Sequence, residues 1–379
     1  MKKIRVAEFF GEPLNYGGQE AFIINLYSKI DKQNYEFSFI TPFECENQKL
    51  KELVKDNKDD IIITGNNKFD SKLRKKSILQ VAKKYLTSEY DVVHIHSGSV
   101  FTLFNVAKIA KKNGIKKVIV HSHAGGKVNI KYKLVKFVSD LSIRKYVDYF
   151  FACSEIAAKW KFPKKIIKEK KYNLIKNGID LDRFRYDPVR REEYRKKFEL
   201  ENKLTLIHVG RFCFEKNQEY IIRIFVELLK LDKTSELFLV GGKGDTLEKI
   251  ENMIKELELE DKVHILINRS DVNNLINMSD VFILPSVWEG LPFTGIEAQA
   301  NGIPCIFSDT ISQELDITNV YNKLSIEENP KIWANKIIEL NKNGRQDTLE
   351  DIRNAGFNIR QVCKFIENIY GGKDAQIQK

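Results

Sequence analysis

The 379-residue chain has no uncharged apolar stretch of the ~18 residues that a membrane-spanning helix needs. Its first residues, MKKIRVAEFFGE, begin with a basic pair, but Arg5 and Glu8 interrupt the apolar run well before it reaches the length of a signal-peptide core. We therefore expect a protein that is not integral to a membrane and whose N-terminus forms a first β-strand.

Cysteine is also scarce. The chain has five cysteines with no C-x-x-C pair, and no set of Cys and His residues has the spacing of a zinc site. Ser/Gly/Pro-rich tracts and long blocks of one charge are absent, so the whole chain is expected to fold. The odd, scattered set of cysteines favours a reduced, cytoplasmic compartment. The cysteines are Cys45, Cys153, Cys213, Cys305 and Cys363.

The net charge of +11 is unevenly distributed. Residues 1–200 contain 42 Lys and Arg against 24 Asp and Glu, a net +18, whereas residues 201–379 contain 21 against 28, a net −7. A basic half is typical of a protein that meets a phosphate-rich partner, either a membrane surface or a nucleic acid. Scattered, solvated lysines explain the same count without any partner.

Short apolar runs alternate with segments of helical periodicity in both halves of the chain. Apolar strands joined by amphipathic helices predict parallel sheets covered on both faces, so each half is expected to be an α/β, Rossmann-like, doubly wound domain. The expected strands are residues 4–9, 37–40, 61–63, 92–96, 118–120 and 149–153 in the first half, and 204–209, 237–240, 263–266, 281–284 and 305–307 in the second.

A polar, charged stretch after the last strand of the first half marks the domain boundary. We expect a first domain over residues 1–200 and a second over residues 201–353. The remaining segment, residues 354–379, has helical character and is expected to return to the first domain.

Glycines and cations gather where strands are expected to end and helices to begin, which is where doubly wound sheets bind their ligands. Gly17 and Gly18 follow the first strand and let the backbone approach a ligand closely, although a glycine pair also makes an ordinary turn. Arg211 and Lys216 follow the first strand of the second half, a placement that suits a diphosphate. A solvated pair of cations is the other interpretation.

Two glutamates, Glu289 and Glu297, flank a Gly/Pro loop in the second half. The loop passes through Gly290 and opens a helix near Phe293 and Thr294, so that Glu297 lies about one turn inside the helix. Carboxylates placed in this way accept hydrogen bonds from sugar and ribose hydroxyls. Solvated glutamates on a surface helix are the alternative, but the apolar run between them favours a cleft.

In this order the motifs resemble those of the family 4 retaining glycosyltransferases of GT-B fold, notably the bacterial enzymes of capsular and exopolysaccharide assembly. The resemblance spans nearly the entire chain, and its most specific part is the pair of glutamates with seven residues between them. Its motifs are Gly17-Gly18-x-Glu20, His121-Ser122-His123, Asn177-Gly178-Ile179-Asp180, Gly210-Arg211-x4-Lys216-Asn217, Pro285-Ser286-x2-Glu289-Gly290, Glu297-Ala298 and Gly356-Phe357-Asn358-Ile359.

The resemblance implies two Rossmann-like domains that face a central cleft, with a nucleotide-sugar donor held by the second domain. Glu297 would bind the donor ribose, and Glu289, beside Gly290, a sugar hydroxyl. Arg211 and Lys216 would bind the diphosphate.

Two further parts of the donor site follow from the resemblance. Backbone amides around Phe293 and Thr294, at the helix start, would complete the phosphate clamp. Gly17 and Gly18 would close over it from the first domain.

A histidine is expected to face the transferred sugar. The resemblance favours His121, at the end of a first-domain strand, with His123 and His96 as rivals. A lone histidine is also often structural. With Glu289, Arg211 and Lys216, His121 makes up the expected catalytic set.

The resemblance also implies retention, in which the acceptor attacks the face that the diphosphate leaves, with no covalent nucleophile and no cofactor. Asp180-Leu181-Asp182 spells the Asp-x-Asp of metal-dependent transferases of another fold, but it follows Asn-Gly-Ile at the domain boundary. We interpret it as a turn and expect no metal. The expected substrates are a UDP-sugar and an acceptor glycan linked to polyprenyl diphosphate, in cell-surface polysaccharide biosynthesis.

Residues 127–150 interleave basic and apolar side chains on a potentially helical segment. Such a segment suits the anionic inner face of the cell membrane, so peripheral docking there is expected, with packing of the apolar residues in the core as the alternative.

Two other functions remain open. A UDP-sugar epimerase shares the two-domain fold, and a nucleic-acid-binding protein would use the basic half, although the sequence lacks an RNA-binding motif and no nucleic acid is expected.

Overall fold

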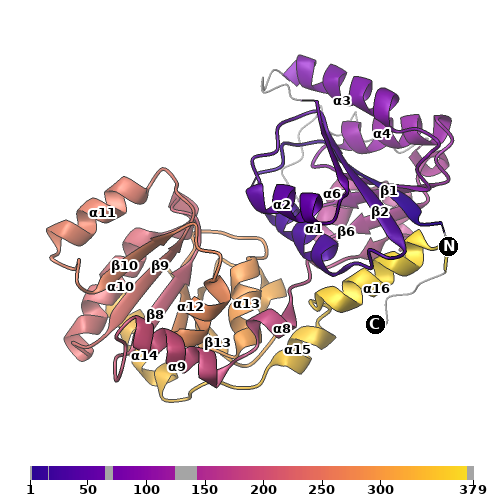
Figure 1. Cartoon of the computed structure of the whole chain (residues 1–379). Coiled ribbons are helices and arrows are strands. Elements are labelled where there is room, and N and C mark those ends of the chain that lie inside the picture. The colour runs from indigo at the N-terminus through magenta and orange to yellow at the C-terminus, as the bar shows by residue number, and fades with distance from the viewer. Residues whose placement is uncertain (1, 16, 65–70, 124–142, 374–379) are drawn as a thin grey trace. The chain divides into compact units, whose positions relative to one another are not determined.

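The computed structural model describes residues 2–15, 17–64, 71–123 and 143–373 (Figure 1). It divides into two compact units. Unit 1 comprises Met1–Gly178 together with Ile359–Lys379, and unit 2 comprises Ile179–Asn358. Among the described residues, no helix is long and apolar enough to cross a membrane.

Unit 1 is built on a seven-stranded parallel sheet with the order β3-β2-β1-β4-β5-β6-β7. Its strands are β1 (Ile4–Phe10), β2 (Tyr35–Thr41), β3 (Asp60–Ile63), β4 (Val92–His96), β5 (Lys117–Ser122), β6 (Tyr149–Ala152) and β7 (Asn173–Leu174). Its helices are α1 (Gly18–Lys29), α2 (Gln48–Asp56), α3 (Ser71–Tyr85), α4 (Val100–Lys112), η1 (Ile143–Lys145), α6 (Glu155–Lys161), α7 (Lys164–Lys168) and α16 (Ile359–Tyr370).

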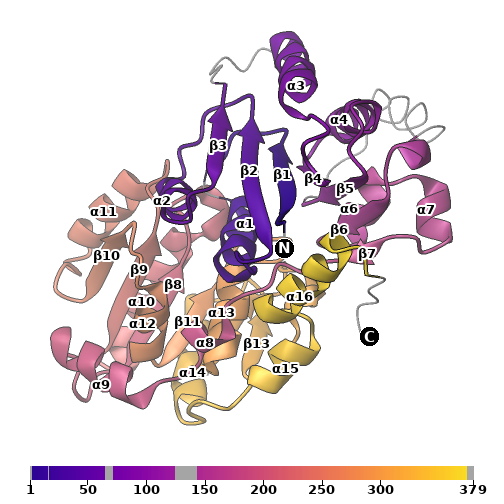
Figure 2. The ribbon, with the colours of Figure 1, turned by 45° about the vertical axis from the view of Figure 1, so that its right-hand side comes forward.

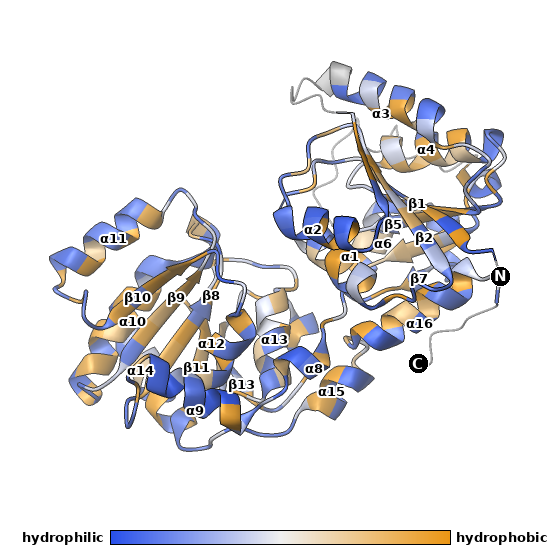
Figure 3. Ribbon diagram, in the orientation of Figure 1, coloured by the Kyte–Doolittle hydropathy of each residue, from blue (hydrophilic) through white to orange (hydrophobic). Residues whose placement is uncertain are grey.

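Helices cover both faces of this sheet. The core on one face joins side chains of α1 and α16 to those of the central strands, and Figures 1 and 2 show these two helices side by side. The core on the other face joins the sheet to α3, α4 and α6. The strands are mainly hydrophobic along their length (Figure 3), as expected for strands buried on both faces.

Unit 2 is built on a six-stranded parallel sheet with the order β10-β9-β8-β11-β12-β13. Its strands are β8 (Thr205–Val209), β9 (Glu236–Gly241), β10 (Val263–Ile267), β11 (Val281–Leu284), β12 (Cys305–Ser308) and β13 (Tyr321–Leu324). Its helices are α8 (Leu181–Phe184), α9 (Pro188–Lys197), η2 (Phe214–Lys216), α10 (Gln218–Leu231), α11 (Leu247–Glu256), α12 (Val272–Met278), α13 (Phe293–Asn301), η3 (Gln313–Leu315), α14 (Pro330–Asn341) and α15 (Leu349–Asn354). The two parallel, doubly wound α/β sheets predicted from the sequence are confirmed.

The polar stretch after Ile179 groups with unit 2, whereas the sequence placed the boundary near residue 200. Arg191 and Arg195 on α9 each donate a hydrogen bond to the carbonyl oxygen of Met278, at 2.7 and 3.0 Å, and both pair with the carboxylate of Asp280. Carbonyl groups in the last turn of a helix such as α12 have no partner within it. Helix α9 therefore packs within unit 2 through its arginines. Its polar composition, which suggested a linker, did not predict these contacts.

The strand order fixes where each unit can bind a ligand. In unit 2 the strand order reverses at β8: β9 and β10 lie on one side of it, and β11, β12 and β13 lie on the other. In unit 1 the order reverses at β1, which lies between β2 and β4. Parallel sheets bind ligands at the carboxyl ends of the strands on either side of such a reversal. The loops after β8 and β11, and those after β1 and β4, are therefore the candidate sites.

Candidate active site

The loops after β8 and β11 are held together by hydrogen bonds between their backbones and side chains. The backbone N–H of Val287 donates to the carbonyl oxygen of Glu215 at 2.8 Å, and Nδ2 of Asn217 donates to the carbonyl oxygen of Pro285 at 3.1 Å. Asn217 has the left-handed φ of 56°, a conformation that asparagine tolerates better than most residues, and α10 begins directly after it. Segments about 70 residues apart in the sequence thus form one surface.

An ion pair joins these two loops. Nζ of Lys216 lies 2.7 Å from Oε2 of Glu289, and the two side chains are 18% and 14% exposed. The hydroxyl of Ser286 donates to the other carboxylate oxygen of Glu289 at 2.5 Å. An ammonium group has three donors, so Lys216 can bind a phosphate oxygen while it holds Glu289. The structure therefore brings together two of the predicted site residues.

The path of the Lys216 side chain requires a glycine beside it. A Cβ atom at Gly210 would lie 2.9 Å from Cδ of Lys216 and 3.0 Å from Nε2 of His208. His208 is fully buried, which lowers its pKa to about 3, and its Nδ1 donates to the carbonyl oxygen of Ile283 at 3.0 Å. The neutral ring is therefore held in place next to Gly210. Packing against His208 and Lys216 explains why the motif has a glycine at this position.

The remaining predicted residue after β8 is placed differently. The side chain of Arg211 is exposed, while its carbonyl oxygen accepts a hydrogen bond from Nε2 of Gln218 at 2.9 Å. This hydrogen bond fixes the backbone of Arg211 and not its side chain. The guanidinium group would therefore have to move toward a ligand to bind it.

Helix α13 presents its amino terminus at the same edge of the sheet. It begins at Phe293, and the preceding Pro292 gives it no side-chain cap. The hydroxyl of Thr294 is buried, and it has no hydrogen-bond partner among the residues that the structure describes. Uncapped backbone N–H groups and an unsatisfied hydroxyl form a site suited to an anion. Glu297 is half-buried in the next turn of this helix.

Gly290 lies in the loop before α13 and is exposed. A Cβ atom there would meet nothing within 4 Å, so no contact within the chain requires glycine at this position. Open space around Gly290 is compatible with a ligand that lies against its backbone.

In unit 1 the Gly17-Gly18 pair forms the start of α1, with Gly17 as the residue before the first helical turn. The carboxylate of Glu20 already occupies this end of the helix: a Cβ at Gly17 would lie 2.8 Å from its Oε2. Burial raises the pKa of Glu20, and backbone hydrogen bonds act in the opposite direction. A phosphate that bound here would meet this carboxylate, which the glycine pattern did not reveal.

Four histidines cluster at the carboxyl edge of the unit 1 sheet. Nε2 of His94 lies 3.2 Å from Nδ1 of His121, and Nδ1 of His96 lies 2.8 Å from Nε2 of His123. Glu8 on β1 closes the group, because its Oε2 lies 2.6 Å from Nε2 of His96. The sequence carried a signal for this cluster: two His-x-His pairs on neighbouring strands, each of which projects both rings to the same face.

The placement of His121 does not fit contact with a sugar. Its ring is fully buried, packed edge-on against Phe22 and Phe151 at 5.0 and 5.8 Å between ring centroids. His123, one residue beyond β5, is partly exposed. Of the three histidines considered from the sequence, His121 and His96 are fully buried, whereas His123 is partly exposed.

Two groups of residues bear on metal binding. Asp180 precedes α8, and its carbonyl oxygen accepts from the N–H groups of Arg183 and Phe184, which makes the Asp-x-Asp segment the turn that opens this helix. In the described part of the chain, His94, His96 and His121 form the group that could hold a metal ion, since their ligand atoms lie within 4.8 Å of one another. Each of the three rings also takes part in one or more of the hydrogen bonds given above.

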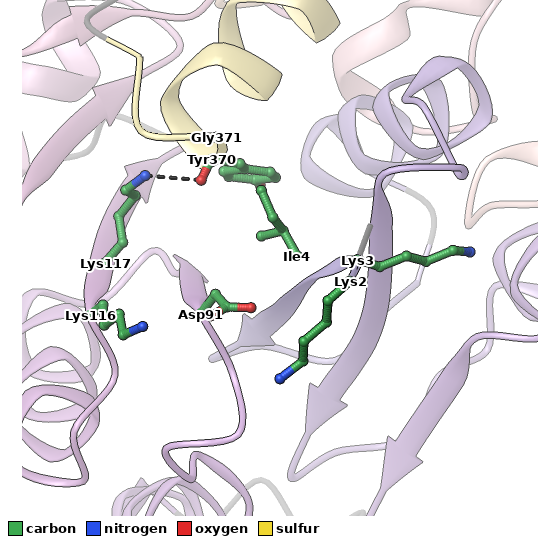
Figure 4. Close-up of a pocket in the computed structure, with 8 residues that line it drawn as sticks. All are labelled: Lys2, Lys3, Ile4, Asp91, Lys116, Lys117, Tyr370 and Gly371. Carbon is green, nitrogen blue, oxygen red and sulfur yellow. Dashed lines mark hydrogen bonds between the residues drawn. The ribbon is translucent and has the colours of Figure 1, made fainter.

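A pocket of about 390 Å³ lies at the opposite edge of the unit 1 sheet, where β1 and β5 begin (Figure 4). Lys2, Lys3, Lys116 and Lys117 line it, and Nζ of Lys117 donates to the carbonyl oxygen of Tyr370 at 2.9 Å. Because it lies at the amino ends of the strands, this pocket is not part of the candidate active site. Of the predicted membrane-binding segment, residues 127–142 lie outside the described residues.

Both units match models of glycosyltransferase families. Residues 16–183 match the model described as Glycosyltransferase Family 4, and residues 190–358 match the model described as Glycosyl transferases group 1.

Similar proteins extend over most of the chain. EpsF of Bacillus subtilis (strain 168), named as a glycosyltransferase, is 26% identical over 365 residues, which is 94% of this chain and 94% of EpsF. The UDP-Gal:alpha-D-GlcNAc-diphosphoundecaprenol alpha-1,3-galactosyltransferase of Escherichia coli is 27% identical over 317 residues, 78% of this chain and 79% of its own. The crystal structure of Anabaena Alr3699/HepE in complex with UDP superposes with a TM-score of 0.71 at 17% identity, covering 98% of this chain and all of that one.

Proposed function

The chain belongs to the family 4 glycosyltransferases of GT-B fold, and we propose that it transfers a sugar from a UDP-sugar, with retention of the anomeric configuration, to an acceptor glycan carried on a polyprenyl diphosphate. The observation that carries the donor side is the meeting of Lys216 and Glu289, 2.7 Å apart, at the strand-order reversal of unit 2. A cation beside an uncapped helix terminus suits the diphosphate of a nucleotide sugar.

In this proposal each donor-site residue has one task. Lys216 and Arg211 neutralise the leaving diphosphate, together with the backbone N–H groups at the start of α13 and the hydroxyl of Thr294. Glu289, held by Lys216 and Ser286, accepts a hydrogen bond from a hydroxyl of the sugar. Most of the rate enhancement then comes from stabilising negative charge on the leaving group and from orienting the acceptor.

Glu297 completes the donor site by binding the ribose. Its place in the second turn of α13 puts its carboxylate on the helix whose first turn would hold the diphosphate. A nucleoside diphosphate that met the start of α13 would carry its ribose along the same helix, where a carboxylate accepts from both ribose hydroxyls.

On the side of the transferred sugar we assign His123 in place of His121. His123 lies at the carboxyl edge of the unit 1 sheet and is partly exposed, whereas no ligand reaches the fully buried ring of His121. No metal and no cofactor enter the proposed reaction, because cationic side chains and helix amides supply the charge that a metal would otherwise supply.

The acceptor and location follow from charge and from the relatives. Unit 1, as the structure divides the chain, holds 39 Lys and Arg against 20 Asp and Glu, a net +19, whereas unit 2 holds 24 against 32, a net −8. A basic unit suits the anionic cytoplasmic leaflet. The E. coli relative, whose name specifies a diphosphoundecaprenol-linked acceptor, supports an acceptor embedded in that membrane and a role in cell-surface polysaccharide biosynthesis.

One experiment tests the proposed reaction against the epimerase. Purified protein is incubated with UDP-, GDP- and ADP-sugars, with and without a polyprenyl-diphosphate-linked glycan, and both the nucleotide and the sugar products are measured. We expect UDP release and glycan extension that depend on the acceptor, with the anomeric configuration of the donor kept in the product. Conversion of the free nucleotide sugar to its epimer without acceptor would contradict the proposal.

A further inference from the structure

A continuous chain of hydrogen bonds runs across three neighbouring strands of unit 1, from the buried interior to the carboxyl edge of the sheet. It starts at Glu8 on β1, passes through His96 at the end of β4 and ends at His123, just after β5. The links are 2.6 Å from Oε2 of Glu8 to Nε2 of His96, and 2.8 Å from Nδ1 of His96 to Nε2 of His123.

The second oxygen of Glu8 is also engaged. The hydroxyl of Tyr370, at the end of α16, donates to Oε1 of Glu8 at 2.9 Å, and it lies 2.7 Å from Nδ1 of His94. Glu8 is 1% exposed and both of its oxygens have partners, so its position is fixed. Burial raises the pKa of Glu8, while His94, Tyr370 and the nearby Lys32 act in the opposite direction.

The direction of these bonds determines where each histidine carries its proton. His96 is fully buried, its Nδ1 lies 2.8 Å from Nε2 of His123, and a neutral imidazole ring has one N–H, so one of these two nitrogens donates and the other accepts. When Glu8 is ionised it only accepts, so the neutral ring of His96 then carries its proton on Nε2 and its Nδ1 is the acceptor toward His123. His123 must then donate from Nε2, which leaves its Nδ1 without a proton.

This Nδ1 is the unsatisfied end of the chain. It is a buried atom with no hydrogen-bond partner among the described residues, in a residue that is partly exposed as a whole. An unpaired acceptor at a ligand-binding edge needs a donor from outside the chain, and a sugar offers hydroxyl groups. The parallel branch through His94 ends on Nε2 of His121, which is fully buried and which no ligand reaches.

We propose that Glu8 is a positioning residue that acts through His96 to hold His123 in the tautomer whose Nδ1 accepts a hydrogen bond from a hydroxyl of the sugar substrate. The proposal rests on the assignment of His123 to the sugar side of the active site. Glu8 itself touches no substrate. Its function is to fix which nitrogen of a distant ring carries the proton, as a buried carboxylate does for the histidine in other enzymes.

The tautomer of His123 can be measured directly. The chain has six histidines, so long-range ¹H–¹⁵N correlation spectra of protein labelled with ¹⁵N-histidine are simple to assign with single substitutions. In the wild-type protein we expect His123 to be protonated on Nε2 and not on Nδ1. A wild-type His123 with its proton on Nδ1 would overturn the proposal without any variant at Glu8.

The kinetic test uses Glu8→Gln, which keeps the shape of the side chain but adds a donor. We expect a lower population of the Nε2-protonated form of His123 and a fall in kcat of about tenfold or more, with little change in KM for the donor sugar. In a His123→Ala background the same substitution should cost nothing further. The matched control is Glu236→Gln in unit 2, which makes the same change at a Glu–His hydrogen bond of the same 2.6 Å length, to His264.

The outcomes separate this inference from the proposed function. Full activity of His123→Ala would remove His123 from the active site, and the proposed role of Glu8 with it. An impaired His123→Ala variant beside a fully active Glu8→Gln variant would contradict the role of Glu8 alone. Equal effects of Glu8→Gln and Glu236→Gln on kcat, with the His123 tautomer unchanged, would show that only stability was lost.

Discussion

Nζ of Lys216 and Oε2 of Glu289 lie 2.7 Å apart, although 73 residues separate them in the sequence. The pair forms because both loops leave the carboxyl ends of adjacent strands, β8 and β11. With 18% and 14% of their side chains exposed, the two groups are partly shielded from water. A substrate phosphate and a sugar hydroxyl can each approach one member of this pair.

The pair should be needed for activity more than for folding. Lys216→Ala leaves Glu289 without its cation and the leaving diphosphate with Arg211 as its one cationic side chain, so we expect kcat/KM to fall by about 10²-fold to 10³-fold. Glu289→Gln keeps the hydrogen bond from Ser286 but weakens acceptance from a sugar hydroxyl, and a smaller loss is expected. Steady-state kinetics with a UDP-sugar, beside thermal melting of each variant, measures both effects. A Lys216→Ala variant with wild-type kinetics would refute the assignment.

The outer residues of the donor site are tested separately. Arg211→Ala and Glu297→Ala should be folded and nearly inactive, each losing about 2 to 4 kcal/mol of transition-state stabilisation. Arg223 and Glu248 are exposed residues of the same unit outside the candidate site, so Arg223→Ala and Glu248→Ala serve as matched controls with unchanged activity. Wild-type turnover in either test variant would contradict the proposed donor site.

The sequence predicts the two sheets well because each strand is buried on both faces and therefore has a continuous apolar pattern. It misplaces the boundary because the polar composition of α9 is typical of a linker. In the structure, Arg191 and Arg195 of this helix contact other residues of unit 2. The sequence alone also gives no basis for choosing between His121 and His123. The two histidines of this His-x-His motif differ in burial. The burial of His121 depends on its packing against Phe22 and Phe151, which are distant in the sequence.

Substitution by alanine should change stability at one glycine of unit 2 and not at another. A Cβ at Gly241 would lie 1.9 Å from the carbonyl oxygen of Gly210, so Gly241→Ala should lower the melting temperature markedly through a backbone clash. A Cβ at Gly290 meets nothing within 4 Å, so Gly290→Ala should fold as the wild type does. If the substrate lies against this backbone, Gly290→Ala should raise KM for the donor. A stable Gly290→Ala variant with unchanged kinetics would exclude Gly290 from the donor site.

Chelation should leave the reaction intact. Because Lys216, Arg211 and helix amides provide the positive charge in the proposal, activity should persist in excess chelator. Activity that returns only with added Mg²⁺ or Mn²⁺ would instead support a metal site at Asp180 and Asp182. Metal analysis of the purified protein gives an independent check, since bound metal that resists chelation would point to the His94, His96 and His121 group.

The charge difference between the units predicts how the protein meets a membrane. Unit 1, with its net +19, should bind anionic vesicles, and unit 2, with its net −8, should not contribute. Each basic residue near an anionic surface contributes about 1 kcal/mol, and salt screens the attraction. Binding should therefore be absent with neutral vesicles and weaken steeply as salt is raised.

Sedimentation with phosphatidylglycerol-containing and neutral vesicles measures this binding. Replacing Lys131, Lys133 and Lys136 by Gln removes three charges from the segment predicted to dock, and vesicle binding should fall by an order of magnitude or more, about 3 kcal/mol at most. The control replaces three exposed lysines of unit 2, namely Lys196, Lys230 and Lys255, and so removes the same total charge. It should leave binding unchanged because unit 2 is not expected to contribute to docking. If both triple variants lose binding equally, net charge and not the segment governs docking. Binding that survives high salt, or that fails with both kinds of vesicle, would contradict electrostatic docking altogether.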